Sequence, residues 1–342
     1  MEITTLGIDL AKSVFQLHGV DRDHRIVLRR KLSRAKLPEF IATLPKCLIV
    51  MESCIGAHAW GRKFKEYGHE VKLIAPEFVR PFVKSNKNDA VDAEAIVEAA
   101  IRPSMRFVAI NTIEQQDIQL LHRARERLVR DKVSLMNQIR GLLLEYGIAL
   151  PKGKNSIEKG IPEVLSRQDS KILSEMGNQL FSELLTELKN TKEKLAGYDE
   201  KIEAIFKAHP ICKRLAKIPG VGPLTATAML ATIGDPKSFK NGRQLSAYLG
   251  LVPRQHSTGG KDRLLGISKR GDPYLRKLLI HGARTVLQWV DDKSDPKSLW
   301  LKKLVERRGI NRATVALANK NARVIWVLMT KGDDYQVSRV AA

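Results

Sequence analysis

The sequence predicts an α/β domain at the N-terminus, followed by a long α-helical coiled-coil region and a mainly helical C-terminal domain. Three observations lead to this prediction. Strand and helix patterns alternate over the first hundred residues, long amphipathic helix patterns begin near Thr112, and the section from about His209 is helical and basic. The 342 residues are enough for about two domains of roughly 150 residues each. The predicted boundaries are 1–108, 109–208 and 209–342.

The N-terminal domain opens with three short strand patterns in series, ITTLGIDLA, SVFQLHGVD and RIVLRRKLS. Helix and strand patterns then alternate through LPEFIATLP, KCLIVMES, HAWGRKFKEYGH, EVKLIAP and DAVDAEAIVEAAI. This order of elements is found in ribonuclease-H-like folds. In such folds the first strand lies beside the strand that ends at Glu52, and a late helix brings further acids across.

Four carboxylates in this domain lie where they could form a metal site. Asp9 and Glu52 each lie where an apolar strand pattern ends, and Asp89 and Asp92 share one face of a helix start, whereas Glu94 lies on another face and is left out. Carboxylate oxygens suit Mg²⁺, and two such ions can stabilise both oxygens of a phosphoryl displacement. Taken singly, Asp9 fits a turn residue and Asp89 a helix N-cap equally well. The four together predict a site for two Mg²⁺ ions.

The charge of the chain indicates its partners. A net charge of +22 and a pI near 10.0 favour nucleic acid, because Lys and Arg neutralise phosphates. We expect no membrane partner, because no basic amphipathic helix stands apart from the fold and no apolar run could span a bilayer. The first residues, MEITTLGIDL, also lack the basic region of a signal peptide. The three cysteines lack metal-binding spacing and fit a reducing cytoplasm.

Two long amphipathic helices form the middle region. Apolar residues recur at steps of three and four through EQQDIQLLHRARERLVRDKVSLMNQIRGLLLEYGI. After a break rich in Gly, Pro and Lys, the pattern returns through LFSELLTELKNTKEKLAGYDEKIEAIF. The pair predicts a coiled coil that joins protomers into a homodimer or homotetramer. The alternative is a spacer pair that packs only on its own chain.

The C-terminal region holds two phosphate-related patterns. Gly220 and Gly222 form a tight turn before an apolar helix, which looks like a helix-hairpin-helix whose N–H groups hold a phosphate, although such turns also simply join core helices. Further on, a Ser-Thr-Gly-Gly loop carries a hydroxyl that could attack a phosphodiester, or could make only a local turn bond. The cations that we expect to bind nucleic acid follow this loop: Lys261, Arg263, Lys269, Arg270, Arg276 and Lys277.

Nearly the whole chain resembles one protein family. The resemblance rests on the motifs GIDLAK, NKNDAVDA, IPGVGPLTA and GLVPRQHSTGGKDRLLGISKRGDPYLRKLLIHGAR, and on the ES that ends a strand. They look like the DEDD transposases of bacterial insertion sequences, in the IS-one-ten family and its IS-eleven-eleven branch. The resemblance implies a RuvC-like DEDD domain, a coiled coil and a C-terminal transposase domain that supplies a serine. It assigns the acids to Asp9, Glu52, Asp89 and Asp92.

The same resemblance places the nucleophile at one of two neighbours. Alignment through ISKRGD gives Ser257 and alignment from GLVP gives Thr258; we favour Ser257 because its primary hydroxyl is less hindered. The implied activity is recombination through a covalent phosphoserine link and a four-way junction. A noncoding guide RNA would pair with donor and target DNA, and the protein would act at the nucleoid in a bacterial cytoplasm.

Two rival functions stay open. A Mg²⁺-dependent Holliday-junction-type endonuclease would use the same acids with water in place of the serine. A non-enzymatic architectural protein would bind nucleic acid through its basic helical half. A third class, the actin-like kinases, shares the early strand order but would need a Gly-rich phosphate loop, which we do not find in the sequence.

Overall fold

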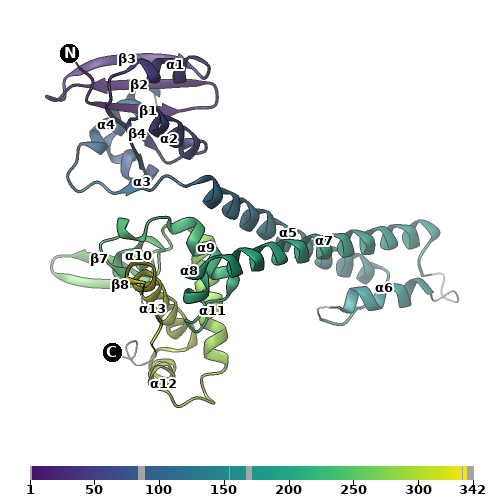
Figure 1. The fold of residues 1–342 in the computed structure, drawn as a ribbon. Coiled ribbons are helices and arrows are strands. Elements are labelled where there is room, and N and C mark those ends of the chain that lie inside the picture. Colours follow the sequence, from purple (N-terminus) through teal and green to yellow (C-terminus); the bar gives the residue numbers. More distant parts are fainter. Residues whose placement is uncertain (1, 84–88, 154, 167–171, 333, 337–342) are drawn as a thin grey trace. The chain divides into compact units, whose positions relative to one another are not determined.

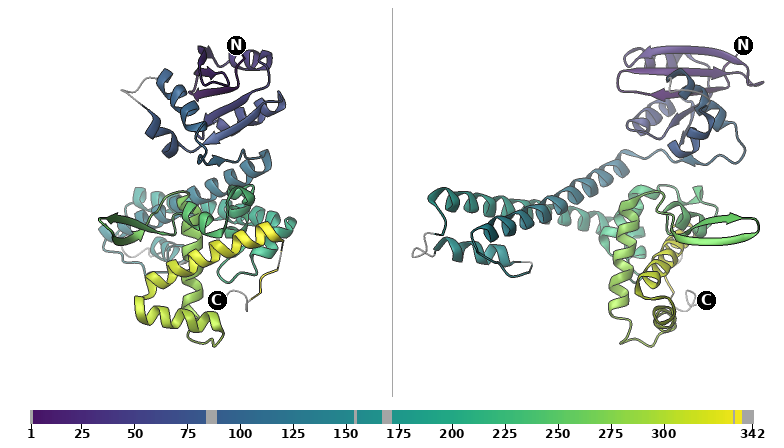
Figure 2. Two further views of the ribbon diagram at one scale, coloured as in Figure 1. Left: turned by 90° about the vertical axis from the view of Figure 1, so that its left-hand side faces the viewer. Right: turned by 180° about the vertical axis from the view of Figure 1, so that it is seen from behind.

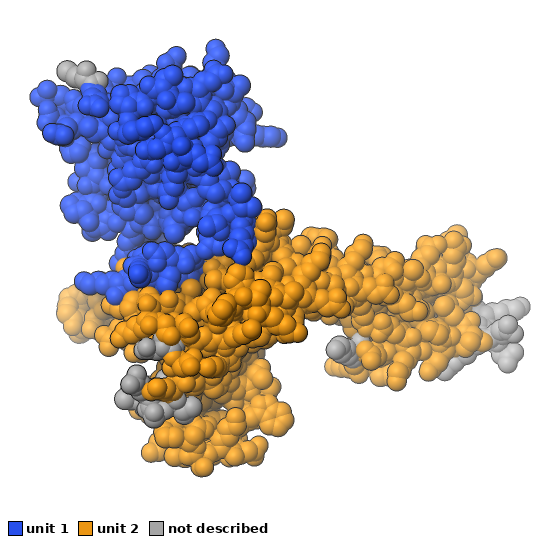
Figure 3. Space-filling model, viewed as in Figure 1, with its two compact units in different colours: residues 1–115, 233–240 blue, residues 116–232, 241–342 orange. Residues whose placement is uncertain are grey.

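The computed structural model describes residues 2–83, 89–153, 155–166, 172–332 and 334–336, with the side chains of 89 and 90 also outside the description. The chain divides into two compact units (Figure 3). Unit 1 comprises residues 1–115 and 233–240, and unit 2 comprises residues 116–232 and 241–342. The three predicted domain boundaries stay predictions.

Unit 1 is built on a six-stranded mixed sheet with the order β3-β2-β1-β4-β5-β6 (Figure 1). The strands are β1 (Thr5–Leu10), β2 (Val14–Val20), β3 (Ile26–Ser33), β4 (Leu48–Glu52), β5 (Glu70–Ile74) and β6 (Phe107–Val108). β1 pairs antiparallel with β2 and parallel with β4. The predicted α/β domain, including the neighbouring placement of the first strand and the strand ending at Glu52, is confirmed.

Helices cover both faces of this sheet. Leu37 of α1 (Lys36–Thr43) and Phe64 of α2 (Ala57–Glu66) join one core cluster with Ile8 and Met51. The opposite face carries α3 (Pro76–Val79), the short 3-10 helix η1 (Arg80–Phe82) and α4 (Asp89–Ala100), whose Ile96 packs in a second cluster. Because side chains alternate along a strand, residues next to Ile8 and Met51 face the α4 side.

Unit 2 contains the long helices. α5 (Ile113–Glu145) begins in unit 1, and α7 is Glu175–Ala208. Both run along one arm in Figure 1 and in the right-hand view of Figure 2, and a buried cluster that includes Ile139 and Leu188 joins them. The predicted break contains a helix, α6 (Ser156–Ser166), because Ile157 and Ile161 complete the same cluster. This packing within one chain fits the spacer interpretation, and the coiled coil between protomers stays a prediction.

The rest of unit 2 is mostly helical, as predicted. Its helices are α8 (Pro210–Leu215), α9 (Pro223–Ile233), α10 (Gly242–Tyr248), α11 (Pro273–Gln288), α12 (Pro296–Arg308) and α13 (Ile310–Lys331). The last residue of α9 and a second 3-10 helix, η2 (Pro236–Ser238), belong to unit 1. Two strands, β7 (Pro253–Thr258) and β8 (Lys261–Ile267), pair as an antiparallel hairpin. None of the helices in the described ranges has the length and apolarity needed to cross a membrane.

A buried polar link joins three helices of unit 2. His122 of α5 is 3% exposed; its Nδ1 lies 2.9 Å from the Tyr274 hydroxyl on α11 and its Nε2 lies 3.0 Å from Thr227 Oγ1 on α9. Thr227 Oγ1 donates its proton to the Pro223 carbonyl at 2.8 Å. Thr227 therefore accepts from Nε2–H, and Tyr274 donates to Nδ1, which satisfies a neutral imidazole completely.

Candidate functional site

Two of the predicted acids lie side by side in unit 1. Asp9 is in β1 and Glu52 is the last residue of β4. Parallel pairing matches Ile8 with Met51, so Asp9 and Glu52 follow at neighbouring positions of adjacent strands. Both lie out of phase with the fully buried Ile8 and Met51, which places them on the sheet face that α4 covers.

Gly7 lets α4 approach this face closely. A Cβ atom at Gly7 would lie 2.6 Å from the Ala93 carbonyl oxygen and 2.6 Å from Val97 Cγ2. Only a residue without a side chain allows this contact between strand and helix. Since Ala93 follows Asp92, the contact brings Asp92 to the strand that carries Asp9.

Electrostatic coupling shows that three of the predicted acids share one neighbourhood. Burial raises the pKa of Glu52, the negative charge of Asp92 raises it further, and Arg80 opposes the shift. Burial also raises the pKa of the Cys54 thiol, with further contributions from Glu52 and then Asp9. Negative charge therefore gathers here, and a cation would relieve the repulsion.

The predicted metal set is only partly described. Asp89 is the first residue of α4, but its side chain lies outside the description. Among the side chains that are described, no group of three or more His, Cys, Asp and Glu could hold a metal ion. The donors fit Mg²⁺ chemically, because they are carboxylates, and the charge of Asp92 raises the pKa of the neighbouring Glu52. Glu94, excluded from the predicted set, pairs with Arg29 at 3.0 Å.

Arg80 and Cys54 are neighbours of this site that the sequence analysis does not name. Arg80 lies in η1, and Cys54 comes two residues after Glu52. Neither forms a motif with the acids, so only the fold identifies them.

The candidate nucleophile lies on the β7–β8 hairpin of unit 2. The prediction of a Ser-Thr-Gly-Gly loop is wrong for Ser257 and Thr258, because these two residues end a strand. Gly259 and Gly260 form a two-residue turn with φ values of +56° and +73°, the left-handed pair that tight hairpins favour. β7 is exposed throughout and lacks the apolar alternation by which strands are predicted.

The hairpin surrounds the Ser257 hydroxyl with polar partners. Ser257 Oγ donates to Asp262 Oδ1 at 2.6 Å across the strand pair. Gln255 Nε2 donates to Ser257 Oγ at 2.8 Å and to Asp262 Oδ1 at 3.0 Å. These hydrogen bonds lower the pKa of Asp262; the bond from Ser257 has the larger effect and the bond from Gln255 the smaller. The cross-strand register, which is not apparent in the sequence, creates this arrangement.

Thr258, the alternative nucleophile, has a different environment. It pairs with Lys261 next to the glycine turn. Within the described residues, no side-chain hydrogen bond of Thr258 is found. The hydroxyl that the hairpin orients is that of Ser257.

The predicted nucleic-acid-binding cations divide into two groups. Four of them are exposed on β8 or in the turn before α11: Lys261, Arg263, Lys269 and Arg270. Arg276 instead donates to the carbonyls of Leu249 and Arg270, at 3.1 and 2.7 Å. Lys277 forms an ion pair with Glu126 of α5. Arg276 and Lys277 therefore bind other residues of unit 2, whereas the four exposed cations face solvent.

The predicted glycine turn packs tightly against α11. Gly220 has a φ of +89°, and a Cβ there would lie 2.7 Å from the Gly282 carbonyl oxygen. A Cβ at Gly222 would meet nothing within 4 Å. Packing explains Gly220, and phosphate binding by this turn stays a prediction.

Comparisons with known proteins agree over most of the chain. A family model described as "Transposase IS116/IS110/IS902 family" matches residues 212–297, and a DEDD transposase model named for IS110 matches residues 6–148. A probable family 20 transposase of Pseudomonas aeruginosa is 48% identical over 98% of this chain and 99% of the relative. The transposase for insertion sequence element IS1111A of Coxiella burnetii is 49% identical over 98% and 92%. The transposase for IS1328 of Yersinia enterocolitica is 44% identical over 96% and 98%.

Proposed function

The chain belongs to the IS116/IS110/IS902 family of transposases, and from this we propose that it cuts and rejoins DNA strands of an insertion sequence. The observation that carries the proposal is the gathering of Asp9, Glu52 and Asp92 on one face of the unit 1 sheet. A carboxylate cluster in a chain of net charge +22 suits chemistry on a phosphate backbone.

The fold of unit 1 is proposed to be ribonuclease-H-like, in the RuvC-like form. The order β3-β2-β1-β4-β5, with β1 parallel to β4 and β4 parallel to β5, supports this assignment. So does α4, whose Ala93 and Val97 approach β1 at Gly7 from one face of the sheet. The assignment rests on fold analogy and on the acids that the fold positions.

The acids of unit 1 are proposed to be Mg²⁺ ligands. Asp9, Glu52, Asp89 and Asp92 would hold two ions, which supply stabilisation of the charge on the attacking and leaving oxygens of a phosphoryl displacement. The chain's own contribution is to place Glu52 and Asp92 close enough for the charge of Asp92 to raise the pKa of Glu52, which the charge of Arg80 opposes.

Ser257 is proposed to be the nucleophile. Its oxygen would form a bond to a DNA phosphorus while the bond from that phosphorus to one deoxyribose oxygen breaks. The hydrogen bond to Asp262 orients the Ser257 hydroxyl and offers an acceptor for its proton. The product is a covalent phosphoserine link, which strand exchange through a four-way junction would resolve.

The proposed partners are donor DNA, target DNA and a noncoding guide RNA. Exposed cations on the hairpin and the following turn can bind phosphate backbones of any sequence. Base pairing with an RNA would then supply the choice of site, which backbone contacts do not. The protein is proposed to act at the bacterial nucleoid as a homodimer or homotetramer.

A suicide DNA substrate, nicked so that cleavage traps the enzyme, tests this function. We expect a covalent protein–DNA band with the native chain and with Thr258→Ala, and none with Ser257→Ala. Asp9→Asn should also lose the band while it binds DNA with unchanged affinity. Cleavage without any band would favour the water-using endonuclease, and a function that Asp9→Asn leaves intact would favour the architectural protein.

A further inference from the structure

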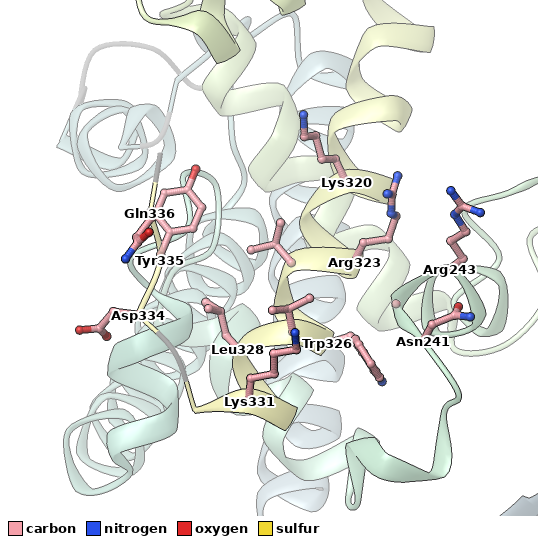
Figure 4. Close-up of a pocket in the computed structure, with 13 residues that line it drawn as sticks. Asn241, Arg243, Lys320, Arg323, Trp326, Leu328, Lys331, Asp334, Tyr335 and Gln336 are labelled. Carbon is pink, nitrogen blue, oxygen red and sulfur yellow. The ribbon is translucent and has the colours of Figure 1, made fainter. Parts of the chain in front are cut away.

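A pocket in unit 2 contains none of the residues assigned above. It lies between α10, α13 and residues 334–336, with a volume of about 530 Å³ (Figure 4). Pockets of a few hundred cubic ångströms typically hold a small organic group.

Four cations line this pocket. Arg243 comes from α10, and Lys320, Arg323 and Lys331 come from α13, where their spacing places them on one helix face. Within the described residues none of the four forms an ion pair. The single carboxylate of the lining, Asp334, is paired at 2.9 Å with Lys217, which is not part of the lining. The pocket therefore has an excess of positive charge.

Aromatic and apolar surfaces lie among these cations. Figure 4 shows Trp326 on the side of α13 near Asn241 and Tyr335 on the other side. Val327 and Leu328 of α13 complete the lining between them. An aromatic face beside cations suits a nucleobase and its phosphate, because every base can stack.

Tyr335 lines the pocket, and its neighbour Lys297 lies outside the lining. Among the described residues, the buried Tyr335 hydroxyl and the buried Lys297 Nζ have no hydrogen-bond partner. Lys297 is 4% exposed, and its ammonium lies over the Tyr335 ring at 5.9 Å. Burial, and then the charge of Lys320, lower the pKa of Lys297 to about 8. Unsatisfied buried groups are uncommon, and an anion in the pocket beside Tyr335 would offset the positive charge that Lys297 adds behind the lining.

We propose that this pocket binds an unpaired nucleotide within a nucleic-acid strand, with its base against Trp326 and its phosphates at Arg243, Arg323 and Lys331. The inference rests on the proposed function, since it adds a subsite for the nucleic acid. A strand fits better than a free nucleotide because Arg323 and Lys331 are separated along α13 by about 12 Å, which is more than the distance between successive phosphates of one strand. A paired base could not stack on Trp326 without leaving its duplex.

The test compares short oligonucleotides of one sequence as single-stranded DNA, single-stranded RNA and DNA duplex, with free AMP as competitor. We expect Trp326→Ala to weaken single-strand binding roughly tenfold and duplex binding little, and Trp326→Phe to retain most of it. Arg243→Ala with Arg323→Ala should weaken it further. An iodouracil in the strand should crosslink to the peptide that contains Trp326, and the tighter of the DNA and RNA arms identifies the source of the strand.

Matched controls lie outside the pocket. Trp289 is 62% exposed near the end of α11, and Lys303 and Arg307 are exposed on α12. Trp289→Ala and the Lys303→Ala/Arg307→Ala pair should leave crosslinking to Trp326 unchanged. Equal losses in the Trp326 and Trp289 variants, crosslinks elsewhere, or AMP competition as strong as that of a strand would overturn the proposal.

The same preparations separate this inference from the proposed function. An adduct trapped in the native chain, together with strand binding that Trp326→Ala does not change, would refute only the pocket. Strand binding that depends on Trp326, in a chain that never forms the adduct, would refute only the proposed chemistry.

Discussion

The contacts of a single hydroxyl distinguish Ser257 from Thr258. Sequence alignment leaves the two residues one position apart, but the hairpin places only Ser257 opposite Asp262. Gln255 adds a second polar neighbour that orients both groups. Strand register therefore gives Ser257 a carboxylate partner, and Ser257 as the nucleophile stays a proposal.

Removal of the hydroxyl's acceptor should slow the proposed attack. We expect Asp262→Ala to reduce the rate of adduct formation roughly a hundredfold, the usual scale for loss of a positioned acid–base group. Lys261→Ala, one residue away, should lower DNA affinity alone. Single-turnover trapping at saturating DNA separates these effects, and equal rates in the native chain and Asp262→Ala would show that the hydrogen bond has no catalytic role.

A glycine determines how closely α4 approaches the acids. Gly7→Ala places a Cβ 2.6 Å from Ala93 O and Val97 Cγ2. We expect it to lower the free energy of unfolding by about 1–3 kcal/mol, as overpacking does, and to reduce adduct formation. Gly197→Ala is the control, because its Cβ in α7 meets nothing within 4 Å. It should raise stability by about 0.5–1 kcal/mol. Chemical denaturation measures both, and an unchanged or raised stability for Gly7→Ala would contradict the contact.

At the scale of elements, the hairpin turn decides where the nucleophile lies. Gly259 and Gly260 both have left-handed φ angles, which Asn tolerates and β-branched residues do not. We therefore expect Gly259→Asn to retain adduct formation and Gly260→Val to lose it, with the same melting temperature for both. Retained adduct formation in Gly260→Val would mean that the turn conformation is not required.

The link between α5, α9 and α11 gives unit 2 a pH-dependent stability. In the fold, burial and then the charge of Arg125 lower the pKa of His122 to about 4, whereas the unfolded chain has an ordinary value of about 6.5. Between these values the unfolded state binds more protons than the folded state. Stability is therefore fully present above pH 6.5 and decreases as the pH falls towards 4.

The expected loss due to His122 is about 3 kcal/mol between pH 6.5 and pH 4. His122→Gln keeps one acceptor and one donor for Tyr274 and Thr227 but does not titrate. Denaturation at a series of pH values should show a steeper decline in the native chain than in His122→Gln. Parallel curves would rule out a buried neutral histidine as the cause.

At the scale of the whole molecule, the sequence predicts most of the architecture of each unit. Apolar strand runs that end at Asp9 and Glu52 predict both the sheet and the neighbouring acids, because strand burial and strand-end position are local properties. Long apolar periodicities similarly predict α5 and α7.

The features that the sequence does not predict arise from contacts between distant residues. The β7–β8 hairpin has no buried face, so its pattern is that of a loop, and Asp262 becomes a partner of Ser257 only through register. Arg80 reaches Glu52 only because the sheet folds. The pocket along α13 depends on the return of residues 334–336 to that helix.

The most direct test of this account is peptide mapping of the trapped DNA adduct, with and without Mg²⁺. We expect the nucleotide mass on Ser257 in the native chain, formed only with the divalent ion and absent in Asp9→Asn. A nucleotide attached to any other residue, or an adduct that forms equally well in Asp9→Asn, would contradict the account.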